Sequence, residues 1–225
     1  MKKLMKYPIM LATLLLVGAS AVGSYLDMSK RPLVQLLAQT QHLEETVLSK
    51  ALTAFNNAVA AGVTDSQILT IIDYSKASSE PRLWVFDLAN SELLYEELVA
   101  HGRGSGGNVA EKFSNTPESY QSSIGVFITE ETYTGRNGYS LRLEGLEEGI
   151  NHLARNRAIV IHGANYVSPE FVEKNGRLGR SHGCPAVSPS VNKELINTIK
   201  GGSLVFAYYP NQKWLSESEF LHPAS

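Results

Sequence analysis

From residue 68 onward the chain consists of short runs rich in β-branched and aromatic residues, separated by Gly, Asn, Ser and Pro. Runs of this kind, bounded by turn-forming residues, are typical of strands in a packed sheet. Seven strands are expected, over residues 68–74, 82–88, 93–100, 124–129, 140–143, 158–161 and 203–209. The sequence therefore predicts one domain that is mostly β.

Helical patterns precede and interrupt these strands. In residues 22–65 apolar side chains recur at near-helical spacing, and Gly62 is a stop signal. Segments 146–155 and 189–199 are expected as helical inserts, with Ser188 as a candidate N-cap of the second. The predicted class is therefore mainly β with flanking helices (α+β), in which a helical N-terminal segment precedes the β domain.

The composition excludes several classes of protein. With 43% hydrophobic and 19% charged residues among 225, the chain is too apolar to be intrinsically disordered. Its 20 basic and 22 acidic side chains give a formal charge of −2, which argues against a nucleic-acid partner, because phosphate contacts need a basic face. The single cysteine rules out an intrachain disulfide framework and a multi-cysteine metal site.

The N-terminus has the pattern of a secretory signal. Lysines within the first six residues precede an apolar run at 9–17, and Ala-Ser-Ala at 19–21 fits the small-x-small rule of signal peptidase. We expect a cleaved signal peptide at 1–21 and export to the periplasm or cell envelope. The alternative is an uncleaved membrane anchor, because residues 7–26 carry no charge and about 20 residues span a bilayer.

Export would change the significance of the lone cysteine. Removing residues 1–21 takes away three lysines and no acidic residue, which moves the formal charge from −2 to −5. In an oxidising compartment an exposed thiol is open to oxidation, so an unpaired cysteine there is either deeply buried or functionally used. The expected organisation is a signal peptide at 1–21, a helical segment at 22–65, a catalytic domain at 66–215 and a tail at 216–225.

The chemistry is expected around that thiol. The run 158–161 is a short buried strand that places His162 at its end, and Cys184 follows His182 and Gly183 on an irregular turn. A free thiol is only about 3% thiolate at pH 7, and a neighbouring imidazole can hold a Cys–His ion pair that makes the nucleophile available. The backbone N–H groups of Gly183 and Cys184 are candidate oxyanion donors.

This stretch resembles the signature of the YkuD-type L,D-transpeptidases, cysteine enzymes of bacterial cell-wall synthesis. The similarity is closest to a divergent branch, the murein L,D-transpeptidase catalytic-domain proteins, and covers about residues 65–210. The motif is His162-Gly163 followed by Ser181-His182-Gly183-Cys184, with support from 71–75, 99–103, 113–115, 139–143 and 179–181. The resemblance implies an L,D-transpeptidase-like β-sandwich.

The resemblance also implies a role for each matching residue. Cys184 would be the nucleophile that attacks the carbonyl between the diamino acid and D-Ala of a peptidoglycan tetrapeptide stem. His162 would be the general base, oriented through the backbone carbonyl of Gly163, and His182 and Gly183 would shape the oxyanion site. An amine of a neighbouring stem would take the acyl group from the thioester and form a cross-link, whereas water would give a carboxypeptidase product. No cofactor is implied.

One position departs from the family pattern. Most members carry Arg or Asn two residues after the cysteine, whereas this chain has Ala186. A role in substrate binding must then be filled elsewhere, and the candidates are Arg180 and, second to it, Arg177; the alternative for both arginines is an ordinary solvated loop. Ser181 is also expected to bind the substrate. His101, in a glycine-rich stretch, is expected in a wall of the substrate groove near the active site, the alternative being a plain hairpin loop.

Other functions stay open on the sequence alone. An L,D-carboxypeptidase or endopeptidase could use the same scaffold, and a non-catalytic cell-wall binding module could carry the cysteine as a vestige. A zinc site from His162, His182 and Cys184, with His101 as a further ligand, is chemically possible, but no pair of them has regular helical ligand spacing, so no metal is expected. The sequence does not indicate the oligomeric state.

Overall fold

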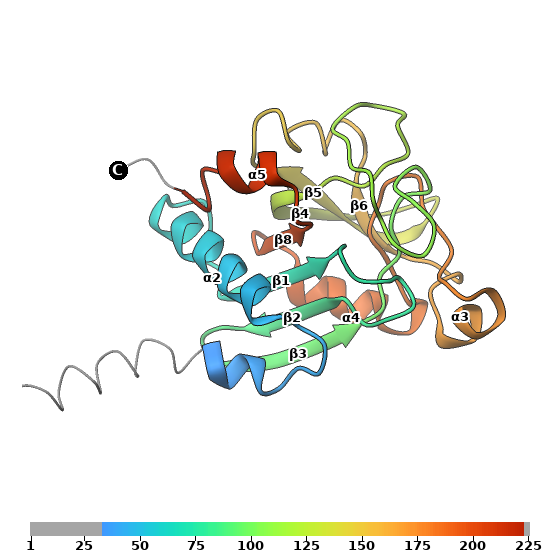
Figure 1. The fold of residues 1–225 in the computed structure, drawn as a ribbon, viewed down its shortest axis with the longest axis horizontal. Helices are drawn as coiled ribbons and strands as arrows, with labels where there is room; N and C mark the ends of the chain where they lie inside the picture. Colours follow the sequence, from blue (N-terminus) through green and yellow to red (C-terminus); the bar gives the residue numbers. More distant parts are fainter. Residues whose placement is uncertain (1–32, 223–225) are drawn as a thin grey trace, which may run out of the picture.

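An eight-stranded mixed sheet forms the centre of the molecule in the computed structural model, which describes residues 33–222 (Figure 1). The strands are β1 (Ile68–Asp73), β2 (Leu83–Asp87), β3 (Glu92–Glu97), β4 (Gly125–Gly135), β5 (Gly138–Gly145), β6 (Val160–Gly163), β7 (Ala186–Val187) and β8 (Leu204–Tyr208). They are hydrogen-bonded in the order β3-β2-β1-β8-β4-β5-β6-β7. All seven expected strands form, and the mainly β class with flanking helices is confirmed. The expected sandwich takes the form of one continuous sheet.

Burial along the strands follows their place in the sheet. The central strands β1 and β8 pair in parallel, and nearly all their residues are buried. The strand β3 lies at an edge, and its residues are exposed or half-buried. Near-continuous apolar runs such as Leu204–Ala207 therefore mark strands that are covered on both faces.

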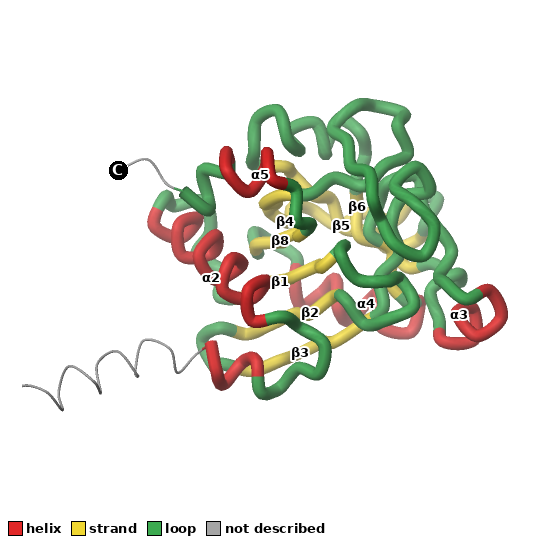
Figure 2. The backbone as a smooth tube through the Cα atoms, viewed as in Figure 1, coloured by secondary structure: helices red, strands yellow, loops and turns green. Residues whose placement is uncertain are grey.

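In the described part of the chain, four helices with defined bounds lie around the sheet (Figure 2). They are α2 (Glu45–Ala60), α3 (Pro169–Asn175), α4 (Pro189–Ile199) and α5 (Gln212–Glu217), and a further helical turn covers 33–37. The expected helix at 189–199 forms as α4, and its predicted N-cap is confirmed, because the Ser188 side chain accepts a hydrogen bond from the Ser190 N–H. The short helices α3 and α5 were not expected from the sequence.

The prediction of a helix at 146–155 is wrong. This segment is a series of turns, because its polar side chains bond to the backbone of β4 instead of leaving the segment free to coil into a helix. Glu147 accepts the N–H of Val126 at 2.7 Å, and the Asn151 amide donates to the carbonyl of Val126 at 2.9 Å. Glu147 also accepts the indole N–H of the fully buried Trp214, which ties α5 to the start of β4.

The helix α2 is part of the same hydrophobic core as the sheet. Its buried face, which includes Leu48, Ala51 and Phe55, lies in one cluster with residues of β1 and β8. The N-terminal segment from α2 onward therefore packs on the β domain. The expected signal peptide at 1–21 lies outside the described residues. Within 33–222 no helix has the length and apolar character needed to cross a membrane.

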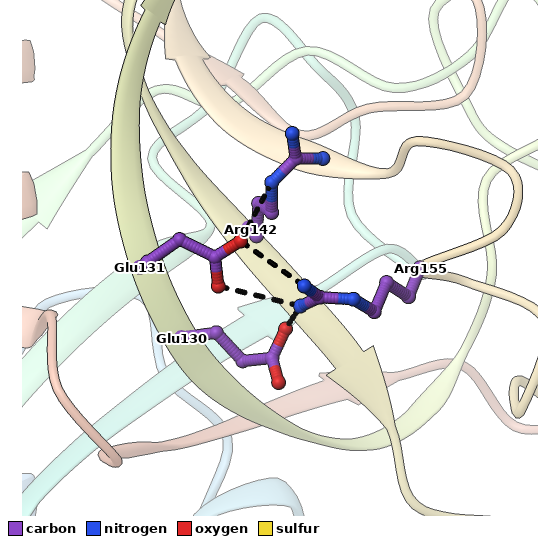
Figure 3. A network of polar contacts seen from close by, with 4 residues as sticks. All are labelled: Glu130, Glu131, Arg142 and Arg155. Carbon is purple, nitrogen blue, oxygen red and sulfur yellow. Dashed lines mark hydrogen bonds and ion pairs between the residues drawn. The ribbon is translucent and has the colours of Figure 1, made fainter.

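The hairpin of β4 and β5 is braced on its outer side by an ion-pair network (Figure 3). The register of the hairpin shifts between Thr129 and Thr132, so the two bulged residues, Glu130 and Glu131, both reach Arg155. Glu131 also pairs with Arg142 of β5 at 2.9 Å. Exposed pairs of this kind contribute little individually, about 0–1 kcal/mol, but this network joins three segments. It ties the hairpin to the loop that leads into β6.

A buried polar cluster lies at the start of β2 and joins it to the segment 99–101. Arg82 is fully buried and donates to the carbonyl oxygens of Val99 and Lys76, and its Nη2 lies 2.8 Å from Nδ1 of His101. Because the guanidinium is the donor, Nδ1 of His101 is the acceptor and the ring is neutral. Burial, together with the charge of Arg82, lowers the pKa of His101 to about 4.

We expect stability to fall on acidification because of His101. Its pKa is about 4 when folded, against an ordinary 6.5, so the unfolded state takes up the proton first as the pH drops. The contribution of His101 to the free energy of unfolding is complete above pH 6.5. It is lost as the pH falls from 6.5 to about 4, by up to about 3 kcal/mol. Denaturant unfolding at several pH values measures this slope.

Other buried groups titrate as well, so a variant is needed to isolate the effect. Burial lowers the pKa of His162 and acts in the same direction, whereas it raises the pKa of Asp73 and Glu147 and acts in the opposite one. His101→Asn keeps an acceptor for Arg82 and removes the titrating ring. This variant should show a shallower loss of stability between pH 6.5 and 4; an unchanged slope would contradict the assignment to His101.

Candidate active site

The site forms where β6 and β7 lie side by side. The two strands pair in parallel with His162 opposite Ala186, and the His162 N–H donates to the carbonyl of Pro185 at 3.4 Å. Cys184 directly precedes Pro185, so the same pairing brings its side chain to the strand that carries His162. The thiol lies 3.6 Å from the carbonyl oxygen of Ala158, just before β6.

Most of the predicted site residues line one cavity of about 310 Å³. Its lining is Arg136, Asn137, His162, Tyr166, Arg180, Ser181, His182 and Cys184. A second cavity of about 550 Å³ shares Arg136, Asn137, His162 and Tyr166 with the first, and its lining also includes Gly163 and Asn192. The thiol and the imidazole thus face a cavity that adjoins a second one at His162.

His162 is held in the form that can accept a proton. The ring is 5% exposed, and its Nδ1 lies 2.9 Å from the carbonyl oxygen of Gly163. A carbonyl only accepts, so Nδ1 carries the proton and Nε2 has a free lone pair. Burial lowers the pKa of His162, which outweighs the opposite effect of the Gly163 hydrogen bond. The ring is therefore neutral at pH 7, and the orientation implied for it through Gly163 is the one observed.

Cys184 is half-buried and protonated in this state. Burial raises the pKa of the thiol, against the backbone N–H groups of Val160 and Cys184 and the charge of Arg157, which lower it. Within residues 33–222, the carbonyl of Ala158 is the one acceptor within hydrogen-bond distance of the thiol. Sγ and the His162 ring therefore share the cavity without a direct hydrogen bond, and such contacts often tighten only when substrate binds.

The turn that carries the thiol is braced by Ser181. Its hydroxyl accepts the N–H of Gly183 at 3.0 Å and donates to the carbonyl of Cys184 at 2.6 Å. The expectation that both Gly183 and Cys184 offer oxyanion donors is therefore corrected, because the Gly183 N–H is already engaged. The Cys184 N–H donates to no other described residue, so of the two it remains the candidate oxyanion donor.

The turn also needs glycine at position 183. Its φ of 127° belongs to a region that L side chains rarely adopt, and a Cβ there would lie 2.9 Å from the carbonyl oxygen of Gln121. Facing it is Gly102, where a Cβ would lie 2.7 Å from the Cα of Gly183 and would also meet the carbonyl of Tyr120. The two glycines allow the backbones of distant segments to touch directly behind the thiol.

His101 does not line the groove, so its expected substrate contact is wrong. The backbone of 99–103 does form the wall behind the thiol, through bridges from Ala100 to Ala186 and from Gly102 to Ser181. The His101 side chain itself is fully buried and bonded to Arg82, on the other side of that wall. The physical reason is the alternation of side chains along an extended segment, which sends neighbouring residues to opposite faces.

The two candidate arginines differ in their placement. Arg180 is exposed, lines the cavity and donates to the carbonyl of Gly106 at 2.8 Å. Arg177 is outside the lining of this cavity and bonds to the carbonyl of its neighbour Leu178 at 2.7 Å, so its substrate contact stays a prediction. The side chain of Arg177 turns back on its own loop, just after the glycine that ends α3.

Several residues at the groove were not foreseen. Arg136 and Asn137 come from the tip of the β4–β5 hairpin, and Tyr166 comes from the loop after β6. At the rim, the Tyr120 ring lies between Arg103, at 4.1 Å, and the exposed His182, at 4.8 Å. Polar residues at a hairpin tip look like an ordinary solvated turn, so no sequence signal marks them.

A metal centre has no ligand set in the described part of the chain. Residues 33–222 contain no group of three or more His, Cys, Asp or Glu side chains placed to bind a metal ion. The cavity lining itself holds two histidines, one cysteine and no carboxylate. The chemistry available at this site is that of a thiol, a neutral imidazole and a backbone N–H.

A comparison with protein families gives one match. A family profile described as L,D-transpeptidase catalytic domain matches residues 39–208. The matched stretch contains α2, all eight strands, His162 and Cys184. No curated protein matches the chain.

Solved structures of distant proteins resemble parts of the chain. An L,D-transpeptidase from Mycobacterium smegmatis is 14% identical, with a TM-score of 0.40 over 64% of this chain and 59% of its own. One from Stackebrandtia nassauensis is 13% identical, with a TM-score of 0.38 over 81% and 91%. One from Enterococcus faecium is 17% identical, with a TM-score of 0.37 over 64% and 50%. The chain thus spans less than two thirds of the first and third, and the match over residues 39–208 is the stronger finding.

Proposed function

Because the chain belongs to the L,D-transpeptidase catalytic-domain family, we propose that it is an exported cysteine acyltransferase that cross-links peptidoglycan stem peptides through a thioester. The observation that carries the proposal is the shared cavity of Cys184 and His162, in which the Gly163 carbonyl fixes the imidazole with Nε2 free. A neutral base beside a protonated thiol is the arrangement that nucleophilic catalysis by cysteine needs.

The proposed acylation uses these atoms in a balanced sequence. Nε2 of His162 takes the proton of the thiol, and Sγ of Cys184 forms a bond to the carbonyl carbon between the diamino acid and D-Ala. The negative charge moves to the carbonyl oxygen, where the N–H of Cys184 stabilises it. The C–N bond then breaks, the D-Ala amine leaves with the proton from His162, and a thioester remains.

An amine of a second stem peptide completes the proposed reaction. It attacks the thioester carbonyl, its proton passes to Nε2 of His162, and that proton returns to Sγ as the thiol leaves. Two adjoining cavities share His162 in their lining, and together they are proposed to hold the two peptides that must meet there. If water replaced the amine, the same steps would give carboxypeptidase activity.

The charge of the cavity supports an anionic substrate. Two arginines, Arg136 and Arg180, line it and no carboxylate does. The formal charge of the whole chain is −2, so it offers no long-range attraction to an anionic wall polymer. Local cations in the cavity are therefore proposed to bind the carboxylates of the stem peptides. Export rests on the N-terminal sequence pattern alone.

Acylation by a carbapenem tests the proposal directly, since this β-lactam acylates such thiols. Intact-mass analysis should show the addition of one carbapenem per chain, and peptide mapping should place it on Cys184. In parallel, tetrapeptide stems incubated with and without an acceptor amine separate cross-linking from hydrolysis. A chain that gains no adduct, or gains it at another residue, would contradict the proposed nucleophile.

A further inference from the structure

Arg157 is a half-buried cation close to the thiol-bearing turn, in the loop that leads into β6. Its guanidinium donates to four oxygens, and all four are neutral. They are the carbonyl of Ser114, the hydroxyl of Ser123 at 2.6 Å, the hydroxyl of Ser119 at 3.2 Å and the carbonyl of Gln121 at 2.6 Å. These bonds fix the guanidinium in one place and hold the segment 114–123 to the loop before β6.

The positive charge of Arg157 has no carboxylate partner within residues 33–222, where it forms no ion pair. The nearby Arg155, which is more exposed, pairs with both Glu130 and Glu131. Removing a charge from water is costly, so buried charges in proteins are ordinarily paired. An unpaired, partly buried guanidinium is therefore a prepared site for a negative charge.

The anion that this site can serve is the thiolate of Cys184. Nη2 of Arg157 lies 3.6 Å from the position a Cβ would take on Gly183, the residue before the cysteine. The residue after Arg157 is Ala158, whose carbonyl oxygen lies 3.6 Å from Sγ. The guanidinium and the thiol therefore lie against the same turn.

The electrostatic effects of the two groups are reciprocal. The charge of Arg157 lowers the pKa of Cys184 against the larger effect of burial, and the thiolate raises the pKa of Arg157, which burial lowers. The other ionisable side chains around the thiol are Tyr74, Arg136, His162, Tyr166, Arg180 and His182. Among Arg136, Arg157 and Arg180, the charge of Arg157 is the one that lowers the pKa of the thiol.

We propose that Arg157 is a positioning residue for Cys184: its guanidinium offsets the negative charge of the thiolate, and its hydrogen bonds hold the segment 114–123 against the turn. When the S–H bond breaks, the proton moves to Nε2 of His162 and the electron pair stays on Sγ, close to the guanidinium. Arg180, the candidate to compensate for the alanine at 186, lines the cavity and is exposed, so its expected role in substrate binding is separate from the one proposed for Arg157. The inference rests on the proposed role of Cys184 as the nucleophile.

The pH dependence of alkylation by iodoacetamide tests this inference without any turnover. The chain has one cysteine, so every incorporated group reports on Cys184. Arg157→Gln should raise the apparent pKa of the thiol by about one unit and slow alkylation at pH 7 about tenfold. The matched control is Arg180→Gln, which removes a cation of the same cavity and should leave the apparent pKa unchanged.

Two further variants separate charge from structural support. Ser123→Ala removes one hydrogen bond of Arg157 and keeps its charge, so the apparent pKa should stay at the wild-type value. Arg157→Lys keeps a positive charge but cannot form the four hydrogen bonds, so the apparent pKa of the thiol should stay at the wild-type value. If Arg157→Gln does not fold, Arg157→Lys is the variant that tests the effect of the charge. A wild-type pKa in Arg157→Gln, or a rise of about one unit in either Ser123→Ala or Arg157→Lys, would overturn the inference.

These outcomes are distinct from those that test the proposed function. If Arg157→Gln shows the pKa shift but the wild-type protein neither forms a thioester nor turns over stem peptides, the role of Arg157 is supported and the proposed reaction is contradicted. If the wild-type protein forms the thioester but Arg157→Gln shows no pKa shift of the thiol, the proposed reaction is supported and the role of Arg157 is contradicted.

Discussion

Cys184→Ala is expected to abolish turnover of tetrapeptide stems, leaving no product above the uncatalysed background. The chain contains no second thiol that could take over as nucleophile. Without Sγ no thioester can form, and the neutral His162 has nothing to deprotonate. Mass spectrometry of the stem peptides, with and without an acceptor amine, measures the loss of both cross-linked and hydrolysed products.

This variant should fold normally. The side chain of Cys184 is half-buried, and its contact with the carbonyl of Ala158 is long, at 3.6 Å. A cysteine behaves as a small hydrophobic residue in packing, so the free energy of unfolding should change by no more than about 1 kcal/mol. Turnover in a folded Cys184→Ala protein at the wild-type rate would exclude the cysteine mechanism.

His162→Asn is expected to slow acylation by about 10² to 10⁴-fold, the range contributed by a general base. The asparagine amide can keep the hydrogen bond to the carbonyl of Gly163, but it offers no basic nitrogen in place of Nε2. In the wild-type protein, burial lowers the pKa of His162, so the ring stays neutral and the rate should hold as the pH falls below 6.5. Stopped-flow acylation by a carbapenem between pH 5 and 8 measures both effects.

His182→Asn provides the matched control, because His182 lies in the same cavity but is exposed at its rim against Tyr120. It should slow acylation much less than His162→Asn and keep the same pH dependence. Equal losses in the two variants would contradict the assignment of the base to His162.

The order of the strands along the chain can be predicted from the sequence, because most strands are short apolar runs bounded by turn-forming residues. Apolar runs such as 204–207 and the turn residues between them depend on neighbours in the sequence. The two-residue strand β7 was missed, since a run of two has no pattern and forms only because His162 lies opposite. The segment 146–155 was misjudged because the partner of Glu147, on β4, lies more than twenty residues away.

In the candidate site, too, the residues marked by their neighbours in the sequence could be predicted, and those placed by distant contacts could not. The motif residues His162 and Cys184 are marked by their neighbours in the sequence, and the structure places both at one cavity. The position of Arg157 could not be inferred, because its bonds reach residues between 114 and 123. The burial of His101 likewise depends on Arg82, which lies 19 residues earlier, directly before β2.

The contact between Gly102 and Gly183 has a consequence for how the protein reaches its native state. The two residues come from distant parts of the chain and meet without side chains, so the enclosure behind the thiol cannot form until much of the sheet is in place. Contacts of long sequence separation form slowly, since the intervening chain must be closed into a loop first. During that interval the thiol of Cys184 is open to oxidants. Having no other cysteine in the chain to pair with, it can be lost to oxidation or to a bond with another molecule, but not to an internal mispairing.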